Sequence, residues 1–85
     1  MIRVRVFAAL RELAGTGELQ ASGRSVADVV EATVSAVSAV APERAERFAQ
    51  IVAVSSFVVN GERAALEAPV ADGDEVAILP PVSGG

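Results

Sequence analysis

The chain begins with apolar and charged residues in strict alternation. Ile2, Val4 and Val6 are apolar, and Arg3 and Arg5 stand between them. A period of two is typical of a strand that buries one face and exposes the other. The pattern therefore predicts a half-buried strand at the start of the chain.

A short helix and a second strand are predicted next. Apolar residues at helical spacing occupy residues 10–14, and Gly15 and Gly17 follow as a helix end. Residues 18–22, "ELQAS", alternate as a strand does. Phe7, between the first strand and the helix, falls on the arginine face. Packing under a neighbouring loop and contact with a partner are both open for it.

A long helix is predicted from the valines in the middle of the chain. They recur with the 3.6-residue period of a helix and do not fit the alternating pattern of a strand. These valines are Val26, Val29, Val30, Val34, Val37 and Val40. Ser25 and Asp28 form an S-x-x-D pattern that caps a helix start. Pro42 restricts the residue before it, so the helix should end near Val40.

A second helix is predicted to begin at Pro42, because proline suits the first turn of a helix. Its apolar face would contain Ala45, Phe48, Ala49 and Val52. Its charged residues are interpreted as a solvated face rather than an acid–base site; they are Glu43, Arg44, Glu46 and Arg47.

The last third of the chain predicts three strands. "SSFVVNG" runs into Asn60-Gly61, a strong hairpin signal because both residues tolerate positive φ. Residues 62–65 return as a short strand. A turn at residues 72–74 then leads into a strand from Glu75 to Leu79, which two prolines end because they cannot donate to a ladder.

The order of these elements predicts an α+β domain. The two terminal strands are the most apolar, so they should lie side by side in the centre of the sheet. We expect a β-grasp (ubiquitin-like) fold: a mixed sheet of about five strands packed against one main helix. The domain would span residues 1–79, and residues 80–85 would form a flexible, extended C-terminal tail.

Composition narrows the possible functions. The 85 residues suffice for one domain and contain no cysteine and no histidine, which removes disulfides, thiolate metal sites and the commonest catalytic base. Net charge is −4, the wrong sign for a nucleic-acid binder. With no long apolar run and no signal-peptide pattern, we expect a soluble, cytoplasmic protein without a membrane partner. Docking onto basic protein surfaces fits the charge, which by itself names no partner.

The remaining motifs favour ordinary structure over chemistry. "DGDE" at residues 72–75 contains hard oxygen donors, but an acidic turn before a strand explains it better than a metal site, and no metal is expected. Residues 15–17 lack the further glycine or lysine of a phosphate-binding loop. All seven cationic residues are arginine. No side-chain amine is therefore present to accept an acyl group.

The tail "LPPVSGG" is the one segment with a distinctive chemical design. Pro80 and Pro81 stiffen it, and Gly84 and Gly85 lack the Cβ atoms that would collide with a narrow catalytic slot. Extended, residues 80–85 would project roughly 20 Å. The final carboxylate is a poor electrophile and would need activation, such as adenylation with ATP by another protein. A frayed end without a role remains the alternative.

Three segments resemble a known family. "FAALRELAG" (7–15), "DGDEVAILPP" (72–81) and "VSGG" (82–85) look like the small, sulfur carrier subunits of molybdopterin synthase, the MoaD type of the MoaD/ThiS ubiquitin-like family. The resemblance covers nearly the whole chain. Residues 34–55 are its least distinctive part.

The resemblance implies a mechanism for the tail. Gly85 would be adenylated by a ubiquitin-activating-type enzyme, converted to a thiocarboxylate and inserted into the large synthase subunit, where its sulfur goes to precursor Z (cyclic pyranopterin monophosphate). No cofactor would be bound, because ATP is used by the activating enzyme. Gly84 would supply clearance. The other residues implied to contact partners are Phe7, Arg11, Leu79, Pro80, Pro81, Val82 and Ser83.

Two features depart from the family pattern and bear on docking. The second helix within residues 34–55 exceeds the family's usual connection, and Arg63 stands where an apolar contact residue is expected.

Other functions remain open. They are a sulfur carrier for thiamine or cysteine synthesis, a ubiquitin-like protein modifier, and an interaction domain with an inert tail. The absence of lysine predicts that a modifier of this sequence forms no self-linked chains.

Overall fold

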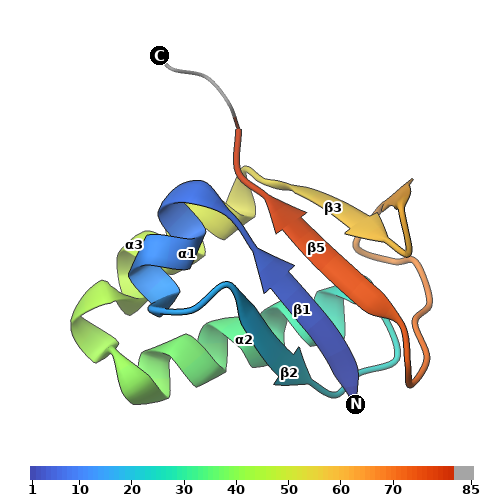
Figure 1. The fold of residues 1–85 in the computed structure, drawn as a ribbon, viewed down its shortest axis with the longest axis horizontal. Coiled ribbons are helices and arrows are strands. Elements are labelled where there is room, and N and C mark those ends of the chain that lie inside the picture. The colour runs from blue at the N-terminus through green and yellow to red at the C-terminus, as the bar shows by residue number, and fades with distance from the viewer. Residues whose placement is uncertain (82–85) are drawn as a thin grey trace.

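The spacing of apolar residues along the chain translates directly into its helices and strands. A computed structural model describes residues 1–81, which form three helices and five strands (Figure 1). In chain order they are β1 (Ile2–Val6), α1 (Ala8–Ala14), β2 (Glu18–Ala21), α2 (Val26–Val40), α3 (Pro42–Ala53), β3 (Ser56–Val59), β4 (Glu62–Ala64) and β5 (Glu75–Leu79). Every element that the pattern predicts is confirmed, with bounds that differ by at most about two residues.

The five strands form one mixed sheet in the order β2-β1-β5-β3-β4. β1 and β5 pair in parallel, and the other neighbours are antiparallel. The two terminal strands therefore lie side by side, with β5 at the centre, as their apolar character predicts. This is the expected α+β arrangement of the β-grasp kind.

The core fills the space between one face of the sheet and the helices. Val4 and Val6 of β1 and Val76 and Ile78 of β5 are at most 1% exposed, because alternate residues of a strand share a face. α2 adds its valine stripe. Leu10 of α1 and Phe48 of α3 are fully buried in the same core, so two further helices join the one main helix that was expected.

Local signals in the sequence explain where the elements begin and turn. The Ser25 hydroxyl oxygen accepts a hydrogen bond from the Asp28 N–H (3.2 Å), and the Asp28 carboxylate accepts one from the Arg24 N–H (3.0 Å). The predicted cap of α2 is thus confirmed, with its return bond one residue earlier than in a capping box. Asn60 and Gly61, with φ of 49° and 88°, form the predicted hairpin turn.

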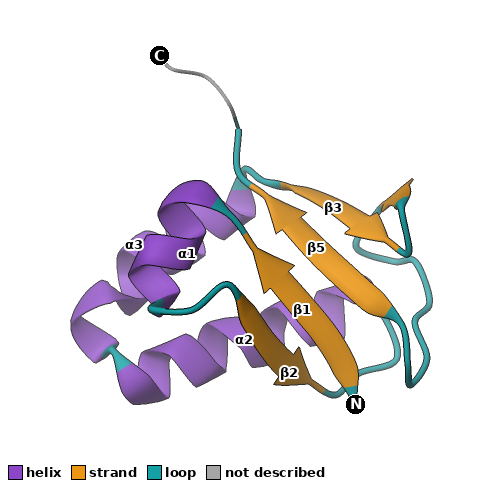
Figure 2. Cartoon of the chain, in the orientation of Figure 1, coloured by secondary structure: helices purple, strands orange, loops and turns teal. Residues whose placement is uncertain are grey.

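The two faces of the sheet have different surroundings. All three helices gather on one side, and α2 runs behind β1 and β2 in the view of Figure 2. Among residues 1–81, no element covers the opposite face. None of the helices in this part of the chain combines the length and apolarity that a membrane span requires.

Candidate functional site

The tail predicted to carry chemistry leaves the body at the end of β5. We call Leu79, Pro80 and Pro81 the tail root. Because β1 and β5 are parallel and Val6 is aligned with Ile78, both strands end at the same edge of the sheet. The start of β3 also reaches this edge, since Ser56 is aligned with Leu79. The tail root therefore emerges between the β1–α1 corner and the α3–β3 junction (Figure 1).

Phe7 lies at the β1–α1 corner beside the tail root. It is half-buried, and the Arg5 guanidinium carbon lies 5.6 Å from the centroid of its ring, a cation–π arrangement. Ala8 follows with a φ of 52°, an uncommon conformation for a residue with a Cβ. This turn takes the chain sharply from the strand into α1. The structure thus brings Phe7 and Leu79, two predicted docking residues, to one edge.

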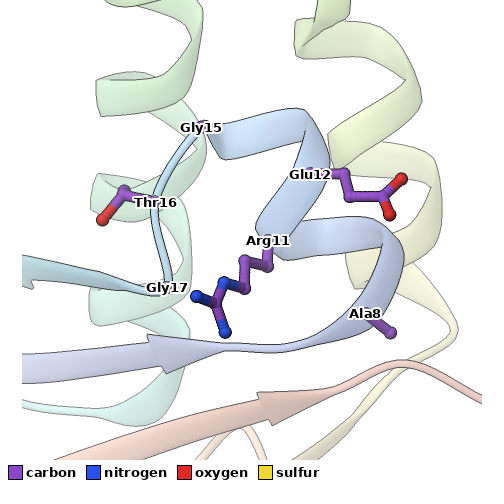
Figure 3. A pocket seen from close by; sticks show the side chains of 6 residues that line it. All are labelled: Ala8, Arg11, Glu12, Gly15, Thr16 and Gly17. Atoms are coloured by element: carbon purple, nitrogen blue, oxygen red, sulfur yellow. The ribbon is translucent and has the colours of Figure 1, made fainter.

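Arg11 lies in a concavity between α1 and the loop that leads to β2. Figure 3 shows its side chain reaching towards Gly17. A Cβ at Gly17 would lie 3.4 Å from the Arg11 Nε, which is an ordinary contact distance, so the Arg11 side chain packs directly against this loop. The concavity is lined by Ala8, Arg11, Glu12, Gly15, Thr16 and Gly17. The Arg11 N–H donates a hydrogen bond to the Phe7 carbonyl oxygen (3.4 Å), one helical turn away, and the docking role of Arg11 stays a prediction.

α1 is tied to α3 by a contact that sequence reasoning missed. The Arg44 Nε donates a hydrogen bond to the Leu13 carbonyl oxygen (2.9 Å), in the last turn of α1. The helix patterning places Arg44 on a solvated face. Its side chain is indeed exposed, yet it stabilises the C-terminal end of a short helix. Nothing in the sequence signals a contact over 31 residues.

Arg63, which departs from the family pattern, lies on the uncovered face of the sheet. Its alignment with Val58 places it there, and its guanidinium donates a hydrogen bond to the Ser56 hydroxyl (3.1 Å). Ser56 is in turn aligned with Leu79. Arg63 therefore reaches back from β4 towards the strand next to the tail root. Only the strand register, which the sequence does not state, could have shown this.

The acidic turn at residues 72–75 has a structural role. The Asp74 carboxylate accepts hydrogen bonds from the Asn60 side-chain amide (3.0 Å) and the Ala71 N–H (2.8 Å). These two donors, the Asn60 amide first, lower the pKa of Asp74 from its ordinary value, against a small opposing effect of desolvation. Within residues 1–81, no three acidic side chains cluster as a metal site requires.

The predicted reactive end of the tail lies beyond this part of the molecule. Val82, Ser83, Gly84 and Gly85 are outside the described residues. For these four residues, the roles in docking and chemistry stay predictions. What the structure describes is the base from which they continue: a central strand, a pair of prolines and a half-buried aromatic neighbour.

Comparison with known protein families shows to which family the chain belongs. The family model described as "ThiS family" matches residues 4–85. The chain belongs to the ThiS family. A ThiS-family relative from Escherichia coli strain K12, the molybdopterin synthase sulfur carrier subunit, is 36% identical over 87 residues and covers both chains completely. The expected resemblance is confirmed, and the chain is a homologue of small sulfur carrier subunits.

Solved structures of relatives share the fold. The small archaeal modifier protein 1 of Methanosarcina acetivorans superposes with a TM-score of 0.79 at 30% identity, covering 99% of this chain and 95% of the other. SAMP1 of Haloferax volcanii gives 0.74 at 32% identity, with 99% and 98% covered. The Amycolatopsis orientalis BexX/CysO complex contains a chain that matches at 0.72 and 28% identity, with both chains covered completely. The β-grasp class predicted for this ThiS-family chain is confirmed.

Proposed function

We propose that this chain is the sulfur carrier subunit of a molybdopterin synthase. In the first step, a carboxylate oxygen of Gly85 attacks the α-phosphorus of ATP and pyrophosphate leaves. Sulfide sulfur then attacks the Gly85 carbonyl carbon and AMP leaves, so a thiocarboxylate forms. The large synthase subunit receives this tail, and the sulfur passes to precursor Z. The chain is a co-substrate in these steps, and the adenylating enzyme and the large subunit supply the catalytic groups.

The observation that carries the proposal is the full-length similarity to the E. coli sulfur carrier subunit. The geometry supports it, since the tail continues from the central strand at an edge where Phe7 and Leu79 offer apolar surface. A site on a rigid strand is held more accurately than one on a loop. ATP belongs to the activating enzyme, so the chain itself holds no cofactor, and the reaction would take place in the cytoplasm.

Intact-mass measurement tests the proposal. The purified chain is incubated with ATP, sulfide and the cognate ubiquitin-activating-type enzyme. We expect a mass gain equal to the difference between one sulfur and one oxygen atom, located in the C-terminal peptide. An unchanged mass, with an enzyme shown to form the adenylate on its own substrate, would overturn the proposal.

A deletion and a substitution provide the matched controls. Deleting Gly85 draws the terminal carboxylate back by about 3.5 Å, so the mass gain should disappear while the thermal unfolding curve stays unchanged. Arg47→Glu changes an exposed residue of α3 and should leave the mass gain intact. Equal mass gain in the deletion variant would contradict the role of Gly85.

A protein modifier is a second candidate because two of the solved relatives carry that name. Such a modifier would join Gly85 to lysines of other proteins, since this chain has none. Trypsin cleaves after lysine and arginine, and Arg63 is the last such residue of this chain. Tryptic digests of cells that express the tagged chain would then contain lysines that carry a remnant of residues 64–85, absent from the Gly85 deletion strain. Lack of such remnants would favour the synthase subunit. A carrier role for cysteine synthesis would instead be favoured by co-purification with the corresponding synthase.

A further inference from the structure

The uncovered face of the sheet carries an apolar strip with one arginine on each side. The strand register aligns Arg5 of β1 with Ala77 of β5, Ala77 with Val58 of β3, and Val58 with Arg63 of β4. These four residues therefore form one row across four strands. Leu79, 37% exposed, lies two residues beyond Ala77 on the same face, at the tail root.

Arg5 of β1 is aligned with Glu18 of β2, but the Glu18 carboxylate approaches the neighbouring Arg3. Its neighbour on the same strand, Arg3, approaches the carboxylates of both Glu18 (4.0 Å) and Glu75 (3.7 Å). Within residues 1–81, Arg5 forms no ion pair and instead lies over the Phe7 ring. The alternating arginines of β1 therefore differ: Arg3 approaches two carboxylates at the surface, and Arg5 contacts an aromatic ring.

Arg63 resembles Arg5 in this respect. Its guanidinium donates to the Ser56 hydroxyl, a neutral acceptor, and forms no ion pair in the described part of the chain. The bond directs it along the sheet towards the strand that flanks Leu79. Three strand spacings separate the two arginines in the row, or roughly 14 Å. We call Arg5 and Arg63 the arginine pair.

We infer that the arginine pair selects a partner whose docking surface is an apolar ridge bordered by carboxylates on both sides. The inference rests on the proposed function, and the partner is the large synthase subunit that receives the tail. The ridge would lie over Ala77 and Val58.

Charge complementarity carries this inference. The chain has a net charge of −4, which favours basic partners, whereas its docking face presents two arginines that form no ion pair with any of residues 1–81. A guanidinium buried at an interface without a carboxylate loses its hydration and gains nothing in return. Aspartate or glutamate opposite each arginine compensates this loss and penalises a basic partner surface. The charge of the docking face, and not the net charge of the chain, therefore determines which partner surface binds.

Binding measurements with charge-reversed variants test the inference. Isothermal titration of the unmodified chain against the cognate large subunit should give a dissociation constant at least about tenfold weaker for both Arg5→Glu and Arg63→Glu. Raising NaCl from about 0.05 M to about 0.5 M should weaken wild-type binding more than binding of either variant. Arg5→Gln and Arg63→Gln should give intermediate losses.

Arg47→Glu is the control, because it makes the same charge change on α3, on the covered side of the sheet. It should bind like the wild type. Thermal unfolding of each variant shows whether it folds, and the glutamine variants serve where charge reversal lowers the melting temperature. Unchanged binding of both reversed variants, equal losses in all three, or losses independent of salt would each overturn the inference.

Failure of the inference can be distinguished from failure of the proposed function. Titration of the unmodified chain requires no sulfur transfer, whereas the mass assay requires no large subunit. Wild-type chain that gains sulfur and binds the large subunit, with an affinity that neither charge reversal changes, overturns the arginine-pair inference alone. Salt-dependent binding that both reversals weaken supports the inference even where no thiocarboxylate forms.

Discussion

The two ends of the central strand β5 are constructed in different ways. At its start, Asn60 and Asp74 join two turns: the Asn60 amide donates to the Asp74 carboxylate, and the Asn60 side-chain oxygen accepts from the Glu75 N–H (2.9 Å). The Asp74 carbonyl also accepts from the Arg3 N–H (3.1 Å). We call this the anchored end. The other end is the tail root, where strand pairing and the contact between Arg5 and Phe7 replace such a network.

This difference shows how a small domain can hold the start of its tail in a defined position. Hydrogen bonds at the anchored end position the start of β5 against both β1 and the hairpin. Packing of Val76 and Ile78 in the core carries that position along the strand. The tail root can then leave its apolar and cationic groups uncovered, because the strand from which it continues is held elsewhere.

Adjacent substitutions in β5 should separate stability from docking. Ile78 is fully buried, so Ile78→Ala should lower the free energy of unfolding by about 2–5 kcal/mol. Leu79 faces the uncovered side and is 37% exposed, so Leu79→Ala should lower it by less than about 1 kcal/mol. Urea denaturation measures both values.

The same two substitutions should have the opposite order of effect on binding to the large subunit. Leu79→Ala should weaken association with the large subunit, whereas the folded fraction of Ile78→Ala should bind like the wild type. If Leu79→Ala loses as much stability as Ile78→Ala, the tail root is part of the core and the two ends of β5 do not differ as described.

The anchored end should be sensitive to acid through Asp74. Hydrogen bonds from Asn60 and Ala71 lower the pKa of Asp74 in the folded state. The carboxylate therefore contributes stability that is fully present above its unfolded pKa of about 4 and is lost as the pH falls through the lower folded value. Asp74→Asn should lower the melting temperature at neutral pH. The deficit should shrink as the pH falls below about 4.

Glu67→Gln is the control for this pH series, since Glu67 is an exposed acid outside the network. Its melting temperature should follow that of the wild type throughout. A deficit of Asp74→Asn that stays constant down to the acidic end would show that shape, and not charge, holds the two turns together.

The fold was predictable from the sequence because its signals are local. Valine periodicity, the Ser25 cap, Pro42 and the Asn60-Gly61 turn each act within a few residues, and the structure confirms each of them. The position of the tail root followed from the two apolar terminal strands. The docking roles of Phe7 and Leu79 stay predictions, although the parallel pairing of β1 with β5 places both at one edge.

Contacts between residues that are far apart in the chain, and contacts set by strand register, could not be predicted from the sequence. Arg44 contacts a carbonyl 31 residues away, and a charged helix residue carries no sign of such a partner. The arginine pair is separated by 58 positions in the chain and becomes a pair only through three strand alignments. Side-chain directions and register are tertiary properties, so local patterning left Arg63 as an unexplained departure.

The smallest expected effect concerns the corner beside the tail root. Ala8 has a φ of 52°, where a Cβ is disfavoured, and glycine removes this strain. Glycine also gains entropy in the unfolded chain, so Ala8→Gly should raise the free energy of unfolding by only about 0.5 kcal/mol. Ala9→Gly, one residue further into α1, should lower it by about 0.5–1 kcal/mol, because glycine is a poor helix former. Opposite signs from neighbouring alanines, measured by urea denaturation, would locate strain at Ala8, on the tail-root side of the molecule. Equal losses would show instead that the corner is an ordinary helix start.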